Sequence, residues 1–139
     1  MIEAVLICTI LAMSDGDSGR CTTQAGERVR VRLAGIDAPE VAPFTRCRTQ
    51  PEIWACSTRA AAFGVTAQAR ARQLTASGAR CTVTDRDRWG RVVARCTVNE
   101  HDLGSIMVRE GLAISESNFG DPYRREERAA RADHLGVWR

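Results

Sequence analysis

The chain carries the sequence RVRVRLAGIDAPE at residues 28–40. Over Arg28–Leu33, arginine alternates strictly with valine or leucine, and this two-residue period predicts a β-strand. The apolar side chains of such a strand face the core, and its three arginines point away from it. The rest of the stretch follows this strand directly, so its polar groups are expected at the end of the strand.

Two carboxylates, Asp37 and Glu40, stand on either side of a proline after the strand. Pro39 fixes its own φ and biases the preceding residue toward extended backbone, which makes a stiff corner. Asp37 offers hard oxygen ligands for a cation, and Arg32 offers a planar fork that matches a phosphate. Taken alone, such a corner is more often an ordinary turn with solvated charges. Two further polar segments decide between these interpretations.

The composition indicates a soluble globular protein. With 139 residues, the chain has the length of one domain with its own core, and we expect residues 1–139 to form a single domain. Charged residues make up 27% and the net charge is +3, which excludes a strongly basic packaging protein. All 20 cationic side chains are arginine, so every cation facing a phosphate would stay protonated at any working pH.

The apolar N-terminal stretch, residues 3–13, resembles the hydrophobic part of a signal peptide. It lacks a basic segment before it and a small-x-small cleavage site before Ser14, and it is too short to span a membrane as a helix. We therefore expect a buried first strand here and no membrane association. Any export signal is expected to be absent from this sequence.

Six cysteines are many for a chain of this size, and no C-x-x-C pair typical of zinc sites is present. Fifteen disulfide pairings are possible in principle. Two cysteines flank a predicted hairpin, two bracket a short loop, and the last two pair by elimination. The expected bridges are Cys81–Cys96, Cys47–Cys56 and Cys8–Cys21. They indicate an oxidising compartment, the periplasm or the outside of the cell; the alternative is a cytosolic protein with buried free thiols.

Five strands and three helices are predicted along the chain. The strands lie at about residues 4–13, 19–23, 28–33, 79–84 and 91–98, and the helices at about 57–77, 102–110 and 121–134. The arginines of the first helix are expected on a solvated face. The long loop 41–56 is expected to be stapled, that is, closed by the Cys47–Cys56 disulfide. Periodicity alone indicates an α+β fold. Five strands with a helix inserted after the third suit a five-stranded OB-type Greek-key β-barrel with three helices.

Three polar segments each lie at a strand boundary: DGDS at 15–18, RLAGIDAPE at 32–40 and DRWGR at 87–91. In this order and spacing they resemble the three signature segments of the staphylococcal nuclease (thermonuclease) family, and the resemblance covers nearly the whole chain. It implies a Ca²⁺-dependent endonuclease, a phosphodiesterase that acts on DNA and RNA. It further implies a preference for single-stranded or open regions and products that carry 3′-phosphates.

The same resemblance implies roles for individual residues. Asp17 and Asp37 would ligate Ca²⁺ through their carboxylates, with the backbone carbonyl of Ala38 as a further ligand. The residues that match the two catalytic arginines and the proposed general base of the family are Arg32, Arg91 and Glu40.

Substrate contacts are implied for Arg88 and Trp89, which occupy positions that flank the bound nucleotide in the family. The sequence departs from the family at residues 114–119, where the type member has two tyrosines and only Phe119 is aromatic here. Stacking of a base on an aromatic ring contributes about 1–3 kcal/mol. The departure therefore bears on substrate affinity rather than on the cleavage machinery.

The implied chemistry is physically coherent. Attack of water on a phosphodiester places negative charge on the phosphate oxygens, and a divalent cation with two fixed guanidinium groups stabilises it. Two carboxylates and one carbonyl should bind Ca²⁺ weakly, at roughly 10⁻⁴–10⁻³ M. The alternative is a catalytically silent OB module that binds nucleic acid or a protein partner. We expect a monomer whose partner is its nucleic-acid substrate.

Overall fold

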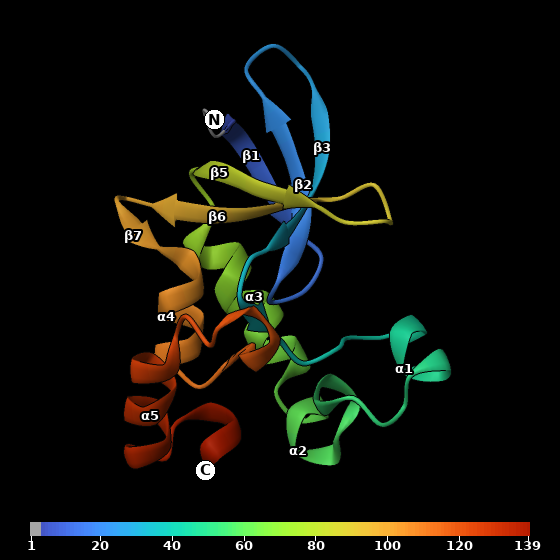
Figure 1. The fold of residues 1–139 in the computed structure, drawn as a ribbon, viewed down its shortest axis with the longest axis vertical. Coiled ribbons are helices and arrows are strands. Elements are labelled where there is room, and N and C mark those ends of the chain that lie inside the picture. Colours follow the sequence, from blue (N-terminus) through green and yellow to red (C-terminus); the bar gives the residue numbers. More distant parts are fainter. Residues whose placement is uncertain (1–3) are drawn as a thin grey trace.

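The structure is a computed structural model, and it describes residues 4–139. Five strands form a closed barrel (Figure 1). They are β1 (Val5–Met13), β2 (Ser18–Thr23), β3 (Arg28–Leu33), β5 (Ala79–Arg86) and β6 (Val92–Val98). Neighbouring strands are antiparallel except at the closure, where β3 pairs with β6 in parallel. The predicted α+β fold with a five-stranded OB-type barrel is confirmed.

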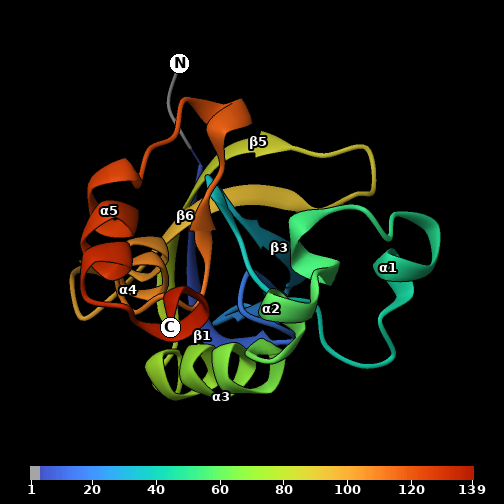
Figure 2. The ribbon, with the colours of Figure 1, turned by 90° about the horizontal axis from the view of Figure 1, so that it is seen from below.

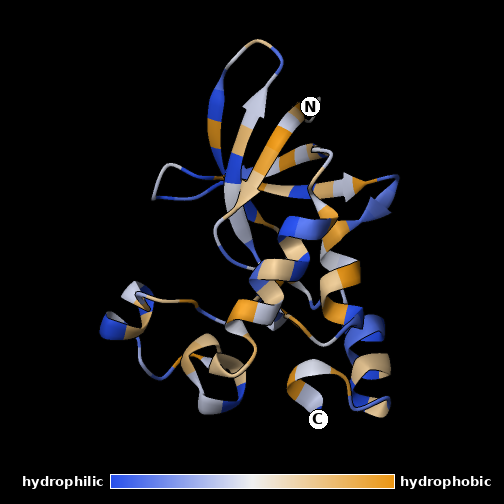
Figure 3. Ribbon diagram, turned by 180° about the vertical axis from the view of Figure 1, so that it is seen from behind, coloured by the Kyte–Doolittle hydropathy of each residue, from blue (hydrophilic) through white to orange (hydrophobic). Residues whose placement is uncertain are grey.

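Period-two alternation explains how β3 lies in the barrel. Val31 and Leu33 are buried in the core, while Arg28 and Arg30 are exposed. Figure 3 shows the alternation as hydrophilic and hydrophobic bands along this strand. The third arginine, Arg32, also leaves the core but is largely covered by carboxylates, as described below.

Helices cover one end of the barrel (Figure 2). They are α3 (Gly64–Leu74), α4 (Leu103–Arg109) and α5 (Arg124–Ala132), with the short α1 (Thr45–Thr49) and α2 (Thr58–Ala61) to one side. Short elements complete the fold: β4 (Ile36–Asp37), β7 (His101–Asp102), β8 (Ile114–Ser115), and the 3₁₀ turns η1 (Trp54–Cys56), η2 (Ser117–Phe119) and η3 (Gly136–Trp138). None of the helices between residues 4 and 139 combines the length and apolar character needed to cross a bilayer.

The single helix predicted over 57–77 is wrong in one respect, because it is broken into α2 and α3. Phe63 leaves helical geometry, and a Cβ at Gly64 would lie 2.4 Å from the Glu40 carbonyl oxygen. The break therefore lets the backbone of the corner approach the start of α3. The arginines of this segment are also not merely solvated: Arg70 pairs with Glu110 at 2.8 Å, and Arg72 Nε donates to the Met13 carbonyl at 2.9 Å.

The other helix predictions hold with one shifted boundary. Asp102 caps α4, since its side chain accepts a hydrogen bond from the Ser105 N–H. The last helix begins at Arg124 rather than after Asp121, because Asp121 has a positive φ of 53° and Tyr123 is not yet helical.

All six cysteines are paired as expected. The bridges are Cys8–Cys21, Cys47–Cys56 and Cys81–Cys96. Cys81 and Cys96 lie directly opposite each other on β5 and β6, which is why the hairpin geometry predicts their bond. The Cys47–Cys56 bridge closes the loop that carries α1, so the expected stapling of residues 41–56 is found.

Candidate active site

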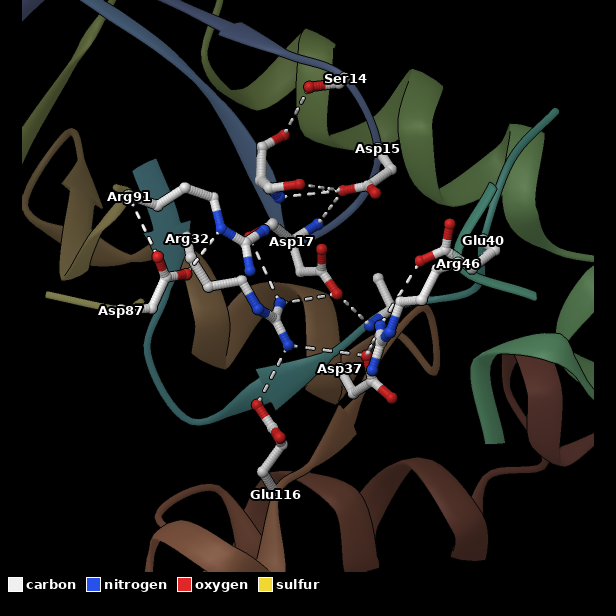
Figure 4. Close-up of polar contacts among 12 residues, drawn as sticks. Ser14, Asp15, Asp17, Arg32, Asp37, Glu40, Arg46, Asp87, Arg91 and Glu116 are labelled. Atoms are coloured by element: carbon white, nitrogen blue, oxygen red, sulfur yellow. Dashed lines mark hydrogen bonds and ion pairs between the residues drawn. The ribbon is translucent and has the colours of Figure 1, made fainter. Parts of the chain in front are cut away.

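Three chain segments meet at one end of the barrel. They are the β1–β2 turn with Asp17, the end of β3 with Arg32, and the corner with Asp37. The turn packs tightly on the corner, since a Cβ at Gly16 would lie 2.7 Å from that of Ala38. The Ala38 N–H donates to Asp17 Oδ2 at 2.7 Å. The two predicted metal-binding carboxylates are thereby brought to the same place, as Figure 4 shows.

The Arg32 guanidinium joins these carboxylates. Its Nη1 lies 2.7 Å from Asp17 Oδ2, and its Nη2 lies 3.6 Å from Asp37 Oδ1 and 3.2 Å from Glu116 Oε1. Glu116 is placed by backbone pairing, because its N–H donates to the Gly35 carbonyl at 2.9 Å. The Arg32 side chain is only 13% exposed. An arginine that faces away from the core is thus held inside a polar cluster.

Negative charge is in excess in this cluster, and the pKa directions reflect it. Burial opposes ionisation of Asp17, but Arg32, the Asp15 side chain and the Ala38 N–H outweigh it and lower its pKa. Burial, together with the Asp17 charge, raises the pKa of Asp37. Burial and the same neighbouring charge raise the pKa of Asp15 to about 7. A bound cation would relieve this repulsion.

The donors present fit a hard divalent cation. Asp17 and Asp37 are 4% and 7% exposed, and together they supply carboxylate oxygens of the kind that Ca²⁺ prefers. Within residues 4–139, no group of three or more His, Cys, Asp or Glu side chains is arranged to hold a metal. The fit therefore concerns a site with two protein carboxylates, whose other ligands would be a backbone carbonyl, water and substrate.

Glu40 lies beside the cluster and contacts a residue from the stapled loop. Arg46, on α1, places its Nη1 3.1 Å from Asp37 Oδ1 and 3.4 Å from Glu40 Oε1. The positive charge of Arg46 thus compensates the carboxylates of Glu40 and Asp37 from the side opposite Arg32 (Figure 4). The backbone N–H of Glu40 also donates to the Ala55 carbonyl at 3.1 Å, which attaches the corner to the same loop.

Arg91 approaches from the β5–β6 hairpin. Its Nε lies 2.7 Å from Asp87 Oδ2, and Asp87 Oδ1 accepts hydrogen bonds from the N–H groups of Trp89 and Arg91. Burial acts against the Asp87 carboxylate, but these hydrogen bonds and the Arg91 charge prevail and lower its pKa. The hairpin turn therefore holds the Arg91 guanidinium in a defined position.

A cavity of about 200 Å³ brings together some of the predicted catalytic and substrate-binding side chains, but Glu40 is not part of its lining. Arg32, Arg91, Trp89, Phe119 and Glu116 all line it. Trp89 is 59% exposed and Phe119 is 62% exposed, so neither ring is a packing anchor and both are accessible to a base. Arg88 is not part of this lining; it lies over the Trp89 ring, 4.6 Å from its centroid.

Residues 30–139 match the family model described as Staphylococcal nuclease homologue. The chain belongs to the staphylococcal nuclease family. Its relatives include an uncharacterized endonuclease of Haemophilus influenzae, 27% identical over 94% of this chain and 65% of the relative. A probable endonuclease LCL3 of Verticillium alfalfae is 32% identical over 81% of this chain and 40% of the relative. Endonuclease YncB of Bacillus subtilis is 28% identical over 89% of this chain and 57% of the relative. The chain thus spans less than two thirds of the length of each of these relatives.

Four charged residues of this staphylococcal nuclease domain lie in the candidate active site, although no role was predicted for them from the sequence. They are Asp15, Arg46, Asp87 and Glu116. Asp15 is in the DGDS segment, and its spacing of two from Asp17 is a usable signal. Arg46 precedes a cysteine of the stapled loop, which is a weak signal. Glu116 follows a two-residue strand, and no local pattern marks it.

Proposed function

We propose that this chain is a Ca²⁺-dependent nuclease that hydrolyses DNA and RNA, prefers single-stranded or open regions, and leaves 3′-phosphates. One observation carries the proposal: the largely buried Arg32 guanidinium contacts both Asp17 and Asp37 and lines a cavity with Arg91. The proposed cation ligands and the guanidinium groups that would bind phosphate are thus adjacent, an arrangement suited to metal-assisted phosphodiester hydrolysis. The printed names of the relatives, which are endonucleases, support it.

The metal would be held by Asp17, Asp37 and the carbonyl of Ala38. When bound, Ca²⁺ would supply Lewis-acid stabilisation of charge on the phosphate. The protein's own part is to keep the two carboxylates in place before the metal arrives. The Ala38 N–H and Arg32 Nη1 each lie 2.7 Å from Asp17 Oδ2, and Arg32 Nη2 lies 3.6 Å from Asp37 Oδ1.

The two arginines would stabilise the transition state. Each guanidinium is planar and has N–H donors in a fork that matches phosphate oxygens. Arg32 is oriented by its carboxylates and Arg91 by Asp87. Removing one such donor typically lowers the rate by about 10²–10³.

Glu40 would act as the general base that takes a proton from the attacking water. Its carboxylate lies on the side of Asp37 away from Arg32, with Arg46 3.4 Å away. Trp89 and Phe119 would contact the bases, and Arg88 would support Trp89 through its cation–π contact. Polar contacts at the backbone and stacking on exposed rings suit an unpaired strand better than a closed duplex.

The natural setting proposed is an oxidising compartment, the periplasm or the outside of the cell, with the protein acting as a monomer. Three disulfides in so small a domain are typical of such compartments and rare in the cytosol.

The proposal is tested by incubating the protein with single-stranded DNA, duplex DNA and RNA in Ca²⁺ or in excess chelator. We expect cleavage with Ca²⁺ only, fastest on single strands, with 3′-phosphate ends. Arg91→Lys, purified in parallel, is the control for contaminating nucleases and should lose most of kcat rather than affinity. Cleavage in chelator, or 3′-hydroxyl products, would contradict the proposal. Binding of nucleic acid with no cleavage under any condition would favour the silent OB module.

A further inference from the structure

A groove of about 520 Å³ lies on the outside of the barrel beside the candidate active site. Four arginines line it, Arg20, Arg30, Arg72 and Arg91, and its other lining residues are small, apolar or hydroxylic. Among residues 4–139, no carboxylate belongs to the lining. The groove therefore concentrates positive charge, although the whole chain has a net charge of only +3.

Two of these arginines face each other at a cost to stability. Arg20 on β2 pairs directly with Arg30 on β3, and like charges directly opposite each other destabilise a sheet. Within residues 4–139, no carboxylate lies within 4.0 Å of the charged nitrogens of Arg20, Arg30 or Arg72. The presence of two like charges opposite each other is explained if an anionic ligand neutralises them when it binds.

Two of the guanidinium groups are oriented by the backbone. Arg30 Nη2 donates to the Trp89 carbonyl, and Arg72 Nε donates to the Met13 carbonyl at 2.9 Å. Each contact uses one N–H donor and leaves the others of the fork available. Because the side chains are already positioned, binding an anion would cost them little further entropy.

The groove is continuous with the candidate active site. Arg91 lines both the groove and the 200 Å³ cavity that contains Arg32. Arg30 precedes Arg32 by two residues on the same face of β3, a separation of about 6.6 Å along an extended strand. A chain of phosphates bound at Arg32 and Arg91 can therefore continue past Arg30 and Arg20.

We propose that this groove binds backbone phosphates of a single-stranded polynucleotide on one side of the phosphate to be cleaved. The proposal rests on the proposed nuclease function and extends it, because it assigns contacts away from the reacting bond. The ligand class follows from the chemistry: several separated forks on an open surface match repeated phosphates, whereas a single small anion would occupy only one or two of them.

The test measures binding rather than cleavage. Fluorescence anisotropy in excess chelator follows a labelled single strand of about 20 nucleotides and one of about four, as DNA and as RNA, over a range of salt concentrations. The test variant combines Arg20→Thr with Arg72→Gln, two residues outside the candidate active site. The matched control combines Arg80→Thr on β5 with Arg125→Gln on α5, which removes the same charge from a strand and a helix elsewhere. Arg20→Thr alone provides a variant that should fold, because it removes the repulsion with Arg30.

We expect the test variant to bind the longer strand about tenfold more weakly in low salt, with a salt slope shallower by roughly 1.4, or about 0.7 for each lost phosphate contact. The short strand should be affected about twofold or less, and Arg20→Thr alone should show part of the loss. The control should match the parent. Equal effects in test and control variants, or no binding of the longer strand by the parent, would overturn the proposal. Cleavage by the parent in Ca²⁺ is scored separately, so failure of the groove and failure of the nuclease function are distinguished.

Discussion

Replacing Arg32 by methionine should strongly destabilise the metal-free protein. The guanidinium lies 2.7 Å from Asp17 and 3.6 Å from Asp37, and both carboxylates are buried. Removing one partner of a buried ion pair leaves an uncompensated charge and typically costs about 3–5 kcal/mol. Arg32→Lys should cost less, because the charge remains, although one ammonium cannot replace a guanidinium shared among several carboxylates.

The assay is urea unfolding at neutral pH in excess chelator and again in Ca²⁺. Arg91→Met is the matched control: the Arg91 guanidinium pairs with Asp87 and is 30% exposed, so its loss should cost less than about 1 kcal/mol. Ca²⁺ should recover part of the loss in Arg32→Met, since a cation at Asp17 and Asp37 replaces the missing positive charge. If Arg32→Met unfolds at the same urea concentration as Arg91→Met in chelator, Arg32 does not hold these carboxylates and the electrostatic reasoning fails.

Three further predictions concern pH, calcium and thiols. Folding raises the pKa of Asp15 from 3.8 to about 7, so between these pH values the folded protein holds a proton on Asp15 that the unfolded chain has lost. The contribution of Asp15 to the free energy of unfolding should therefore fall as the pH rises from about 4 to 7. The stability of Asp15→Asn relative to the parent, measured by urea unfolding in chelator, should therefore increase over this range; a relative decrease would contradict the assignment. Arg46→Gln should bind Ca²⁺ about 3–10-fold more tightly by calorimetry, because it removes a cation 3.1 Å from Asp37; weaker binding would show that Arg46 supports the site instead. The unreduced protein should have no titratable thiol, and loss of the Cys81–Cys96 bridge should cost about 2–5 kcal/mol in unfolding experiments; six reactive thiols would remove the argument for an oxidising compartment.

The sequence by itself determined the features that depend on local periodicity and local geometry. The alternation in Arg28–Leu33 defines which side chains of β3 enter the core, because successive residues of a strand point to opposite faces. Cys81 and Cys96 are equidistant from their hairpin turn, so their pairing is also predictable. The family resemblance identified Asp17, Arg32 and Arg91, which the structure places around one end of the barrel.

The tertiary structure alone decided which charges compensate one another. Glu116 is 84 residues from Arg32 in the chain, and only the pairing of β4 with β8 brings its carboxylate to that guanidinium. Arg46 reaches Asp37 because the stapled loop folds back over the corner. At the break between α2 and α3, Gly64 lies so close to the Glu40 carbonyl that a Cβ there would come within 2.4 Å of its oxygen. Contacts of this kind depend on how loops and short elements fold against the barrel, so they leave no periodic pattern in the sequence.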